Sequence, residues 1–546
     1  MPLRFQFRKI FEKEGLLKRT LNNIDFLQKC PIFTNFVQGK LWKQKTKLYP
    51  NKTVMPYFLY IDDVEINNPL GSHSKVHSIC NIYYSFPCFP MDESKLENVF
   101  LAAVIKSIDV KNHGNDKCFE SLINELKYLE VNGIDIKMDD NSTLRIHFIL
   151  GLVLGDNLGL NSFLDFNKSF SSNSYCRLCK VEKVDCQKLT TENKELMRTI
   201  INYDNDLKIN NSQNTGIKNK SLLNDLPSFH VVENYYADVM HDIFEGVCHY
   251  VLCHAITYFI MKIKYFDLEM LNLRKQNFEY GPKDIENISV WNFLINFIEI
   301  IDILLCYEIN EMNIILLEYK IKKNNNDYVQ LFNDTLKPKF HNLIHYPTII
   351  RQCGPLRKLW CFKYEAKHRQ FKIYSHCITS RKNICFTLSK KYQLQFAYQL
   401  MNSENLSNSV FKFSDKYEIS SNYHSIIINK LQNVNEEDIK LYSRIEYKGV
   451  EYSNKNNYIA VFENDIQIYL ILDIILVQSN KVLFFCQRLQ RLQYRQHFLA
   501  YEINETILGE LFIIFPENII GPPLSLIKSA KGKSMIRVKQ YYKCIT

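Results

Sequence analysis

Two pairs of metal-ligand side chains stand far apart in this sequence. Cys176 and Cys179 form a CxxC motif in NSYCRLCKVEK, and His341 and His345 stand four residues apart in KFHNLIHYP. A four-residue step puts two side chains on one face of a helix, and a CxxC motif is half of a tetrahedral zinc site. Together the four residues predict a Cys2His2 zinc site. With four protein ligands no position stays open, so this zinc would be structural.

The ligand assignment has competitors. The sequence offers further histidines and a cysteine in the same region: His230, His241, His249, His254 and Cys186. Without a metal, the CxxC would be two ordinary thiols and the histidine pair would be hydrogen-bonded core residues.

Three carboxylates predict a second kind of metal site. Asp62 and Asp156 each follow an apolar run, and Glu365 stands in the helical segment Phe362–Lys372. Carboxylates that converge from separate elements are the ligands of paired Mg²⁺ or Mn²⁺ ions in phosphodiester chemistry. The plain alternatives are a surface turn at Asp62-Asp63, a helix cap at Asp156 and a solvated helix face at Glu365. Asp63 also competes with Asp62 for the first position.

The segment Tyr235–Val247, YYADVMHDIFEGV, carries polar side chains on an otherwise apolar helix. Its Asp238, His241, Asp242 and Glu245 follow each other at three- and four-residue steps, which predicts one shared helical face. This face would either position DNA, brace an active site, or form a hydrogen-bonded structural contact.

The elements that would position these residues are read from hydrophobic patterning. Residues 55–160 are expected to form three strands, a helix and a fourth strand, because apolar β-rich runs alternate with turn signals. The expected strands are Tyr57–Ile61, His77–Phe86, Val99–Ile108 and Thr143–Leu154, with the helix at Asp116–Val131. That order is the order of a ribonuclease-H-like fold.

The rest of the chain is expected to be helical and then β-rich. Helices are predicted from Tyr235 to about Lys320 and again over Asn383–Met401, with loops at Asn202–Asn219 and Lys322–Asp327. From about Glu436 the period changes to two, which predicts a small β-barrel or sandwich. Lys448-Gly449 is a hairpin candidate, and Arg488, Arg491 and Arg495 are a possible phosphate-contacting patch.

Composition bounds the class of protein. The chain has 546 residues, 46% of them hydrophobic, with a formal net charge of +10. The modest basic excess is compatible with nucleic acid as a partner. Sixteen scattered cysteines and an N-terminus without an apolar signal segment favour a reducing compartment. The most apolar long segment, Val290–Ile309, carries Asn292, Asn296, Glu299 and Asp302, so we expect a buried helix rather than a membrane span.

These observations give an α/β fold class, a ribonuclease-H-like core interrupted by a large helical zinc-bearing insertion and followed by a small all-β domain. The expected parts are a basic N-terminal segment (1–54), the first half of the core (55–160), the insertion (161–345), the second half with the Glu365 helix (346–402), a linker (403–435) and the β domain (436–546).

Several short motifs resemble, in order and spacing, the DDE transposases of the CACTA/Mirage/Chapaev (CMC, EnSpm-like) group, distant relatives of the V(D)J recombinase catalytic core. They are YIDDVEINNPLGS, LGDNLG with SYCRLCK, DVMHDIFEGV, and KFHNLIHYP followed by FKYEAKHRQFK. The resemblance covers about residues 55–400.

The resemblance implies roles for individual residues. Asp62, Asp156 and Glu365 would be the three catalytic acids with Mg²⁺ or Mn²⁺, and Cys176, Cys179, His341 and His345 would hold zinc. The implied activity is DNA cleavage at transposon ends and transfer of the 3′-hydroxyl to target DNA. The implied setting is nuclear, in a homo-oligomer that pairs DNA ends, without a membrane partner.

Such transposases commonly carry a DNA-binding domain ahead of the core, where this chain has about fifty residues. A catalytically inactive, transposon-derived DNA- or chromatin-binding protein is therefore the alternative, and a zinc-stabilised scaffold unrelated to transposases is a third possibility.

Overall fold

The structure of the chain is a computed structural model. It describes all residues except 67–77, 91–95, 169, 171, 270–271, 273–286, 379–381, 402–410, 418–420, 432–438, 448–449, 455–456, 478–480, 529–531 and 542–546. The chain forms two compact units. The first contains Met1–Cys248, Ile314–Val329 and Asp334–Ser407, and the second contains His249–Asn313, Gln330–Asn333 and Asn408–Thr546. The segment 161–345 is thus divided between the two units.

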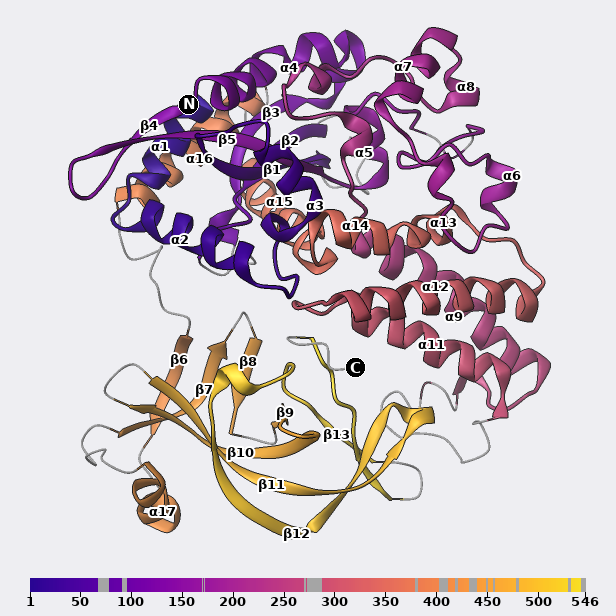
Figure 1. The fold of residues 1–546 in the computed structure, drawn as a ribbon. Coiled ribbons are helices and arrows are strands. Elements are labelled where there is room, and N and C mark those ends of the chain that lie inside the picture. Colours follow the sequence, from indigo (N-terminus) through magenta and orange to yellow (C-terminus); the bar gives the residue numbers. More distant parts are fainter. Residues whose placement is uncertain are drawn as a thin grey trace. The chain divides into compact units, whose positions relative to one another are not determined.

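The first unit is built on a five-stranded sheet with the strand order β3-β2-β1-β5-β4 (Figure 1). Its strands are β1 (Thr53–Glu65), β2 (Ser78–Ser85), β3 (Phe100–Lys106), β4 (Ile134–Lys137) and β5 (Thr143–Leu154). β1 pairs in parallel with β5, and the other three pairings are antiparallel. The four predicted strands are present, with β5 at its predicted bounds. β4 forms an additional hairpin with β5 that the patterning did not predict.

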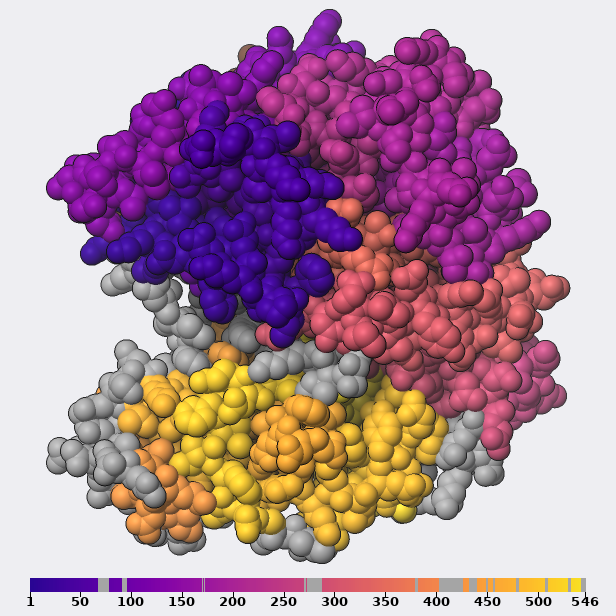
Figure 2. Space-filling model, in the orientation of Figure 1, coloured from indigo at the N-terminus to yellow at the C-terminus, as the bar shows by residue number. Residues whose placement is uncertain are grey.

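Helices cover both faces of this sheet. Neighbouring residues of a strand point to opposite faces, and Tyr83 and Tyr84 of β2 do so here. Tyr83 contacts Phe371 of α15 (Phe362–His376), whereas Tyr84 contacts Phe7 of α1 (Leu3–Phe11). With both faces covered, the central strands β1, β2 and β5 are buried over most of their length, which explains the long apolar run of β5. The N-terminal helices (indigo in Figure 2) form part of the surface of this unit.

The first unit contains most of the helices and helical turns, with α12 (Glu311–Phe332) extending into the second unit at both its ends. They are α1 (Leu3–Phe11), α2 (Leu16–Lys29), η1 (Phe36–Gln38), α3 (Lys40–Thr46), η2 (Leu96–Asn98), α4 (Ser107–Val131), α5 (Asn157–Phe163), α6 (Lys183–Cys186), η3 (Lys194–Leu196), α7 (Ile200–Ile209), α8 (Ser212–Thr215), η4 (Leu222–Asp225), η5 (Val231–Glu233), the π-helix η6 (Met240–Val247), α12 (Glu311–Phe332), α13 (Pro338–Ile344), α14 (Tyr346–Cys353), η9 (Leu356–Lys358), α15 (Phe362–His376) and α16 (Ile384–Met401).

Two loop predictions were wrong. Asn202–Asn219 contains most of α7 and all of α8, because Thr199 and Asn211 cap these helices through their side chains. Lys322–Asp327 lies inside α12, where Tyr328 and other apolar side chains on the same helix are buried and override the polar composition.

The second unit contains a nine-stranded antiparallel sheet. Its strands are β6 (Phe411–Tyr417), β7 (Ile439–Tyr447), β8 (Val450–Ser453), β9 (Tyr458–Phe462), β10 (Ile466–Val477), β11 (Lys481–Arg495), β12 (Ala500–Ile514), β13 (Leu526–Lys528) and β14 (Ser534–Ile536). The order is β13-β14-β12-β11-β10-β7-β6, with β8 on β7 and β9 on β10. The period-two patterning therefore predicted β structure correctly. The hairpin candidate Lys448-Gly449 lies outside the described residues.

The second unit also contains helices and turns: α9 (Cys248–Thr257), the π-helix η7 (Tyr258–Lys262), α11 (Ser289–Leu304), α17 (Ser421–Leu431), η12 (Gln496–Phe498) and η13 (Pro516–Asn518). Contacts of α11 within this unit include Trp291 Nε1 to the His497 carbonyl at 3.0 Å and Asp302 to Arg537 at 2.6 Å. The class is thus mixed α/β with two curled sheets.

Among the described residues, one continuous helical run, Met240–Lys262, is by length and composition alone long and apolar enough to cross a bilayer. Core helices pass the same test. Asp242 in this run is fully buried and accepts hydrogen bonds from Asn157 and Asn342.

The sheet packing predicts a large stability difference between two phenylalanines of the N-terminal helices. Phe7 is fully buried against Tyr57, Tyr84, Phe86 and Phe148. Phe7→Ala should lower the free energy of unfolding by about 3–5 kcal/mol. The matched control Phe26→Ala, at a side chain 68% exposed, should change it by less than about 0.5 kcal/mol. Urea denaturation measures both, and equal effects would contradict this packing.

Candidate functional site

Asp62 in β1 and Asp156 just after β5 lie at the same edge of the first sheet, the one formed by the carboxyl ends of these two parallel strands. In the parallel pair, Tyr60 of β1 is opposite Leu154 of β5, so each aspartate comes two residues after a paired position. Asp62 lies inside β1, which is longer than predicted, and Asp156 caps α5 by accepting the Gly159 N–H at 2.5 Å. The helix-cap alternative for Asp156 is thus observed, and it orients the carboxylate beside β1.

Two glycines allow this close approach. A Cβ on Gly155 would stand 2.7 Å from the Ile61 carbonyl oxygen, and a Cβ on Gly159 would stand 2.8 Å from Asp156 Oδ1. Both distances are too short for real Cβ contacts, so glycine is required where β5 passes into α5 beside β1.

Asp63 points away from Asp62 because neighbouring strand residues alternate between faces. Its carboxylate is exposed and accepts a hydrogen bond from Ser107 at 2.8 Å. The geometry therefore favours Asp62 over Asp63 as the partner of Asp156.

Glu365 reaches this edge from α15, in the first turn of the helix. The adjacent Tyr364 stacks on Tyr60 of β1, with ring centroids 4.4 Å apart and planes 4° apart, and its hydroxyl bonds to Ser85 at 2.7 Å. This buried contact fixes α15 on the strand that carries Asp62. In the part of the chain that the structure describes, the three carboxylates do not offer ligand atoms that all lie within 4.8 Å of one another.

The three acids nevertheless influence one another electrostatically. Burial raises the pKa of Asp156, and the charge of Asp62 raises it further. Burial also raises the pKa of Glu365, to about 7, against the opposing charge of His241 and with the help of Asp62. Carboxylates whose charges repel in this way are an environment that a divalent cation stabilises.

A histidine that the sequence reading missed contacts the first acid. His368 Nε2 lies 3.0 Å from Asp62 Oδ2, which also accepts the Tyr60 hydroxyl at 3.1 Å. The other ring nitrogen of His368 meets the Tyr83 hydroxyl at 3.1 Å. His368 is buried and stands three residues after Glu365 on α15. That EAKH spacing was the available signal, since residues three apart share a helix face.

Asp238 and His241 of the polar segment lie beside Glu365. Asp238 Oδ2 is 2.6 Å from His241 Nδ1, and His241 Nε2 is 3.4 Å from Glu365 Oε1. Burial lowers the pKa of His241, but the hydrogen bond and charge of Asp238 and the charge of Glu365 outweigh it and raise the value to about 9. Asp242 points elsewhere, toward Asn157, Asn342 and Tyr346. The four polar residues therefore do not share one face, because the helix starts after Asp238 and has π-helical geometry.

Cys176, Cys179, His341 and His345 come together in the first unit. All four are buried, and their ligand atoms lie within 4.8 Å of one another. The Cys179 Sγ to His341 Nε2 distance is 3.2 Å, Cys176 Sγ to His345 Nε2 is 3.6 Å, and the two Nε2 atoms are 3.3 Å apart. These spacings are close to those between ligands of a tetrahedral zinc ion, with bonds of about 2.0–2.3 Å. The expectation of a Cys/His cluster able to bind a metal is confirmed.

The surroundings of this cluster also suit a metal. His345 Nδ1 meets Glu192 Oε1 at 2.7 Å, and Glu192 Oε2 accepts the Thr348 hydroxyl at 2.5 Å. Carboxylates commonly orient a metal-binding histidine in this way. A hydrogen bond from Cys179 and the charge of His345 hold the pKa of Cys176 well below its usual range in spite of its burial, whereas the same contact and burial raise the pKa of Cys179, so that the two buried thiols share one proton.

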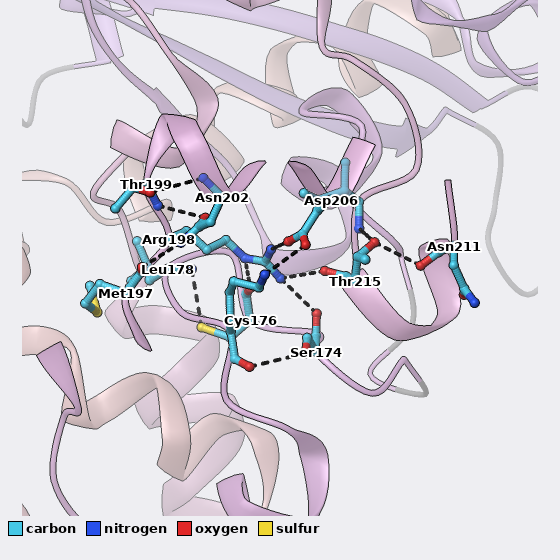
Figure 3. Close-up of polar contacts among 12 residues, drawn as sticks. Ser174, Cys176, Leu178, Met197, Arg198, Thr199, Asn202, Asp206, Asn211 and Thr215 are labelled. Atoms are coloured by element: carbon cyan, nitrogen blue, oxygen red, sulfur yellow. Dashed lines mark hydrogen bonds and ion pairs between the residues drawn. The ribbon is translucent and has the colours of Figure 1, made fainter. Parts of the chain in front are cut away.

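A buried arginine holds the CxxC loop in shape. Arg198 donates to the carbonyl oxygens of Cys176 at 2.9 Å, Ser174 at 3.1 Å and Thr215 at 2.8 Å, and pairs with Asp206 at 3.4 Å (Figure 3). Its own backbone N–H bonds to the Leu178 carbonyl at 2.8 Å. The loop is therefore stabilised by protein contacts on one side and by the cluster on the other.

The competing histidines lie elsewhere. His230 caps η5, His241 pairs with Asp238, and His249 and His254 belong to α9 of the second unit. Cys186 is buried beside the cluster and interacts with His341, but its sulfur is not one of the four ligand atoms that lie within 4.8 Å of one another, and its thiol donates to the Val181 carbonyl.

Hydrogen bonds connect the Cys/His cluster to the helix that Asp156 caps. Arg177, between the two cysteines, donates to Asn161 Oδ1 at 2.6 Å and Asn157 Oδ1 at 3.2 Å. Asn157 in turn donates to Asp242 at 2.9 Å, which also accepts from Asn342 at 3.0 Å, the residue after His341. The cluster thus helps to hold α5, and with it Asp156, in place.

The expected phosphate patch of the second unit is internally paired. Arg488 donates to Gln467 at 2.6 Å, Arg491 pairs with Asp465 at 2.7 Å, and Arg495 pairs with Glu502 at 2.9 Å. Their guanidinium charges are at least partly satisfied within the sheet.

Comparison of the sequence with protein-family models and with curated proteins finds no match.

Loss of one cluster thiol should remove the metal. The purified chain should contain about one zinc per molecule by elemental mass spectrometry, and Cys176→Ser should lose it, since a hydroxyl is a poor zinc ligand. Cys186→Ser should retain it. Zinc retained in Cys176→Ser, or lost only in Cys186→Ser, would contradict the ligand set.

The buried Asp242 predicts a pH dependence of stability. Burial raises its pKa to about 6, above the value near 3.9 of an unfolded chain. Between these two pKa values the folded state keeps a proton that the unfolded chain has lost. The stabilisation that this group contributes is therefore complete below about pH 4 and is lost as the pH rises through about 6. Asp242→Asn cannot ionise, and from pH 4 to pH 7 it should gain up to about 3 kcal/mol relative to wild type.

Urea denaturation at several pH values measures this difference. Asp25→Asn, at an exposed position, controls for the loss of one negative charge. A variant curve that stays parallel to the wild-type curve across this range would contradict the prediction.

Proposed function

We propose that this chain is a transposase-type DNA strand transferase whose Asp62, Asp156 and Glu365 hold Mg²⁺ or Mn²⁺. The observation that carries the proposal is the parallel register of β1 and β5, which sets Asp62 beside Asp156, together with the Tyr364–Tyr60 stack that brings Glu365 to the same edge. The strand order β3-β2-β1-β5, with only β1 and β5 parallel, supports a ribonuclease-H-like core.

In this proposal the divalent ions supply activation of a water or 3′-hydroxyl and stabilisation of the leaving oxygen. The chain's own residues do the holding. Asp62 and Asp156 present oxygens from a rigid sheet edge, and Glu365 presents its carboxylate from a helix docked on that sheet. Burial is the main cause that raises the pKa of Glu365 to about 7, and the charge of Asp62 adds to it against the opposing charge of His241; a bound cation would favour the ionised carboxylate.

The Cys/His cluster is proposed to bind zinc as a structural ion. Four buried protein ligands with a carboxylate partner on His345 support this assignment. With zinc bound, the cluster would hold the CxxC loop in place, and Arg177 of that loop contacts α5. DNA as substrate, a homo-oligomer that pairs DNA ends and a nuclear location belong to the same proposal.

Cleavage of plasmid DNA tests the proposal. Wild-type protein with Mn²⁺ or Mg²⁺ should nick supercoiled plasmid, and Asp156→Asn should reduce the rate by about 10²–10³-fold because an ion-holding charge is lost. Asp63→Asn, on the opposite face of the same strand, is the matched control and should retain the wild-type rate.

The outcomes separate the alternatives. DNA binding by gel shift without nicking would favour the catalytically inactive DNA-binding protein. Neither binding nor nicking, with zinc still present, would favour a zinc-stabilised scaffold of another kind. Nicking that Asp156→Asn leaves unchanged would contradict the assignment of the acids.

A further inference from the structure

A buried carboxylate, Asp238, stands at the start of the helix that carries Glu365. Asp238 Oδ1 accepts the backbone N–H of Cys361, the residue that precedes α15, at 3.0 Å. The first N–H groups of a helix have no partner within the helix, so a buried carboxylate that accepts one of them fixes that end of the helix. Asp238 is only 2% exposed, so this bond is shielded from water.

The other oxygen of Asp238 holds His241. Oδ2 accepts the His241 backbone N–H at 3.1 Å and lies 2.6 Å from Nδ1 of its ring. With Nδ1 engaged by a carboxylate, the ring is fixed in orientation and Nε2 is directed outward. Nε2 lies 3.4 Å from Glu365 Oε1. One carboxylate thus secures both the backbone that carries Glu365 and the side chain that faces it.

A metal ion is a poorer explanation of this group. Asp238, His241 and Cys361 offer ligand atoms within 4.8 Å of one another. However, the 2.6 Å between Asp238 Oδ2 and His241 Nδ1 is hydrogen-bond length. Two ligands on one tetrahedral zinc with bonds of about 2.0 Å stand roughly 3.3 Å apart.

We propose that Asp238 and His241 are positioning residues that set the carboxylate of Glu365 for binding of a divalent ion. This inference rests on the proposed function, because it assigns the purpose of the contact to the ion that Glu365 would hold. Outer partners of metal ligands typically contribute about 10–100-fold in metal affinity. Removing the imidazole should therefore weaken the ion held by Glu365 and leave the Cys/His cluster loaded.

Binding of Mn²⁺, followed by electron paramagnetic resonance, tests this without DNA. The full chain with its zinc is titrated with Mn²⁺, and the sites that depend on the acids are defined by their loss in Asp62→Asn and Glu365→Gln. His241→Ala should raise the Mn²⁺ dissociation constant at least about tenfold. Glu245→Gln is the matched control, since Glu245 faces the same Nε2 at 3.9 Å but is 61% exposed, and it should change the constant less than twofold.

Two isosteric variants separate positioning from folding. The amide nitrogen of glutamine falls near the Nε2 position of histidine, and that of asparagine near Nδ1. His241→Gln should keep the dissociation constant within about threefold of wild type, since it keeps the donor toward Glu365, whereas His241→Asn should match His241→Ala. A purely structural role would reverse this order, because only asparagine keeps the bond to Asp238. Thermal unfolding of each variant shows whether the fold is intact, and if His241→Ala does not fold, the Gln and Asn pair still decides.

Each outcome has one meaning. Wild-type affinity in His241→Asn, or loss in His241→Gln alone, overturns the positioning role while the proposed function stands. Wild-type Mn²⁺ binding that neither Asp62→Asn nor Glu365→Gln affects overturns the proposed function, and this inference with it.

Discussion

Parallel pairing between β1 and β5 is the constraint on which the candidate site depends. Two neighbouring parallel strands end at the same edge of a sheet, so their register brings Asp62 and Asp156 together although 94 positions separate them along the chain (156 − 62). The approach is close enough that Gly155 and Gly159 have no room for a side chain. The sheet therefore holds two carboxylates side by side, with charges that disfavour each other's ionised form.

Each of the three acids has its own protein partner. His368 and Tyr60 meet Asp62, the Gly159 N–H meets Asp156, and His241 faces Glu365. Partly buried charges without such partners would be costly. The partners come from different elements, so the acids are held by the packing of α15, α5 and η6 on the sheet rather than by any one loop.

The Cys/His cluster belongs to the same network. Arg177 contacts α5 from the CxxC loop, and Asp242 joins α5 to the helices that carry His341 and His345. Buried polar networks of this kind are stabilising only when their members are satisfied. Among the described residues His341 Nδ1 has no hydrogen-bond partner, so this member of the network is not fully satisfied.

The sequence by itself determined the local chemistry: the CxxC and HxxxH spacings, the apolar runs before Asp62 and Asp156, and the change to period two near Glu436. These signals act over one helical turn or one strand, where spacing alone decides which side chains share a face. Prediction from the sequence failed where helix capping or the burial of apolar neighbours overrode local composition, as in the Asn/Lys-rich stretches that form α7, α8 and part of α12.

Only the tertiary structure decided which distant residues meet. Strand register and the docking of α15 decide three of these contacts. His241 faces Glu365, His368 reaches Asp62, and Asp63 points away from Asp62. These are non-local contacts, set by the burial of Tyr364 on Tyr60 and by hydrogen bonds between elements more than 100 positions apart, such as Asp238 to Cys361 (361 − 238 = 123). No spacing within one element carries that information, because the energy that fixes it arises only when the elements pack.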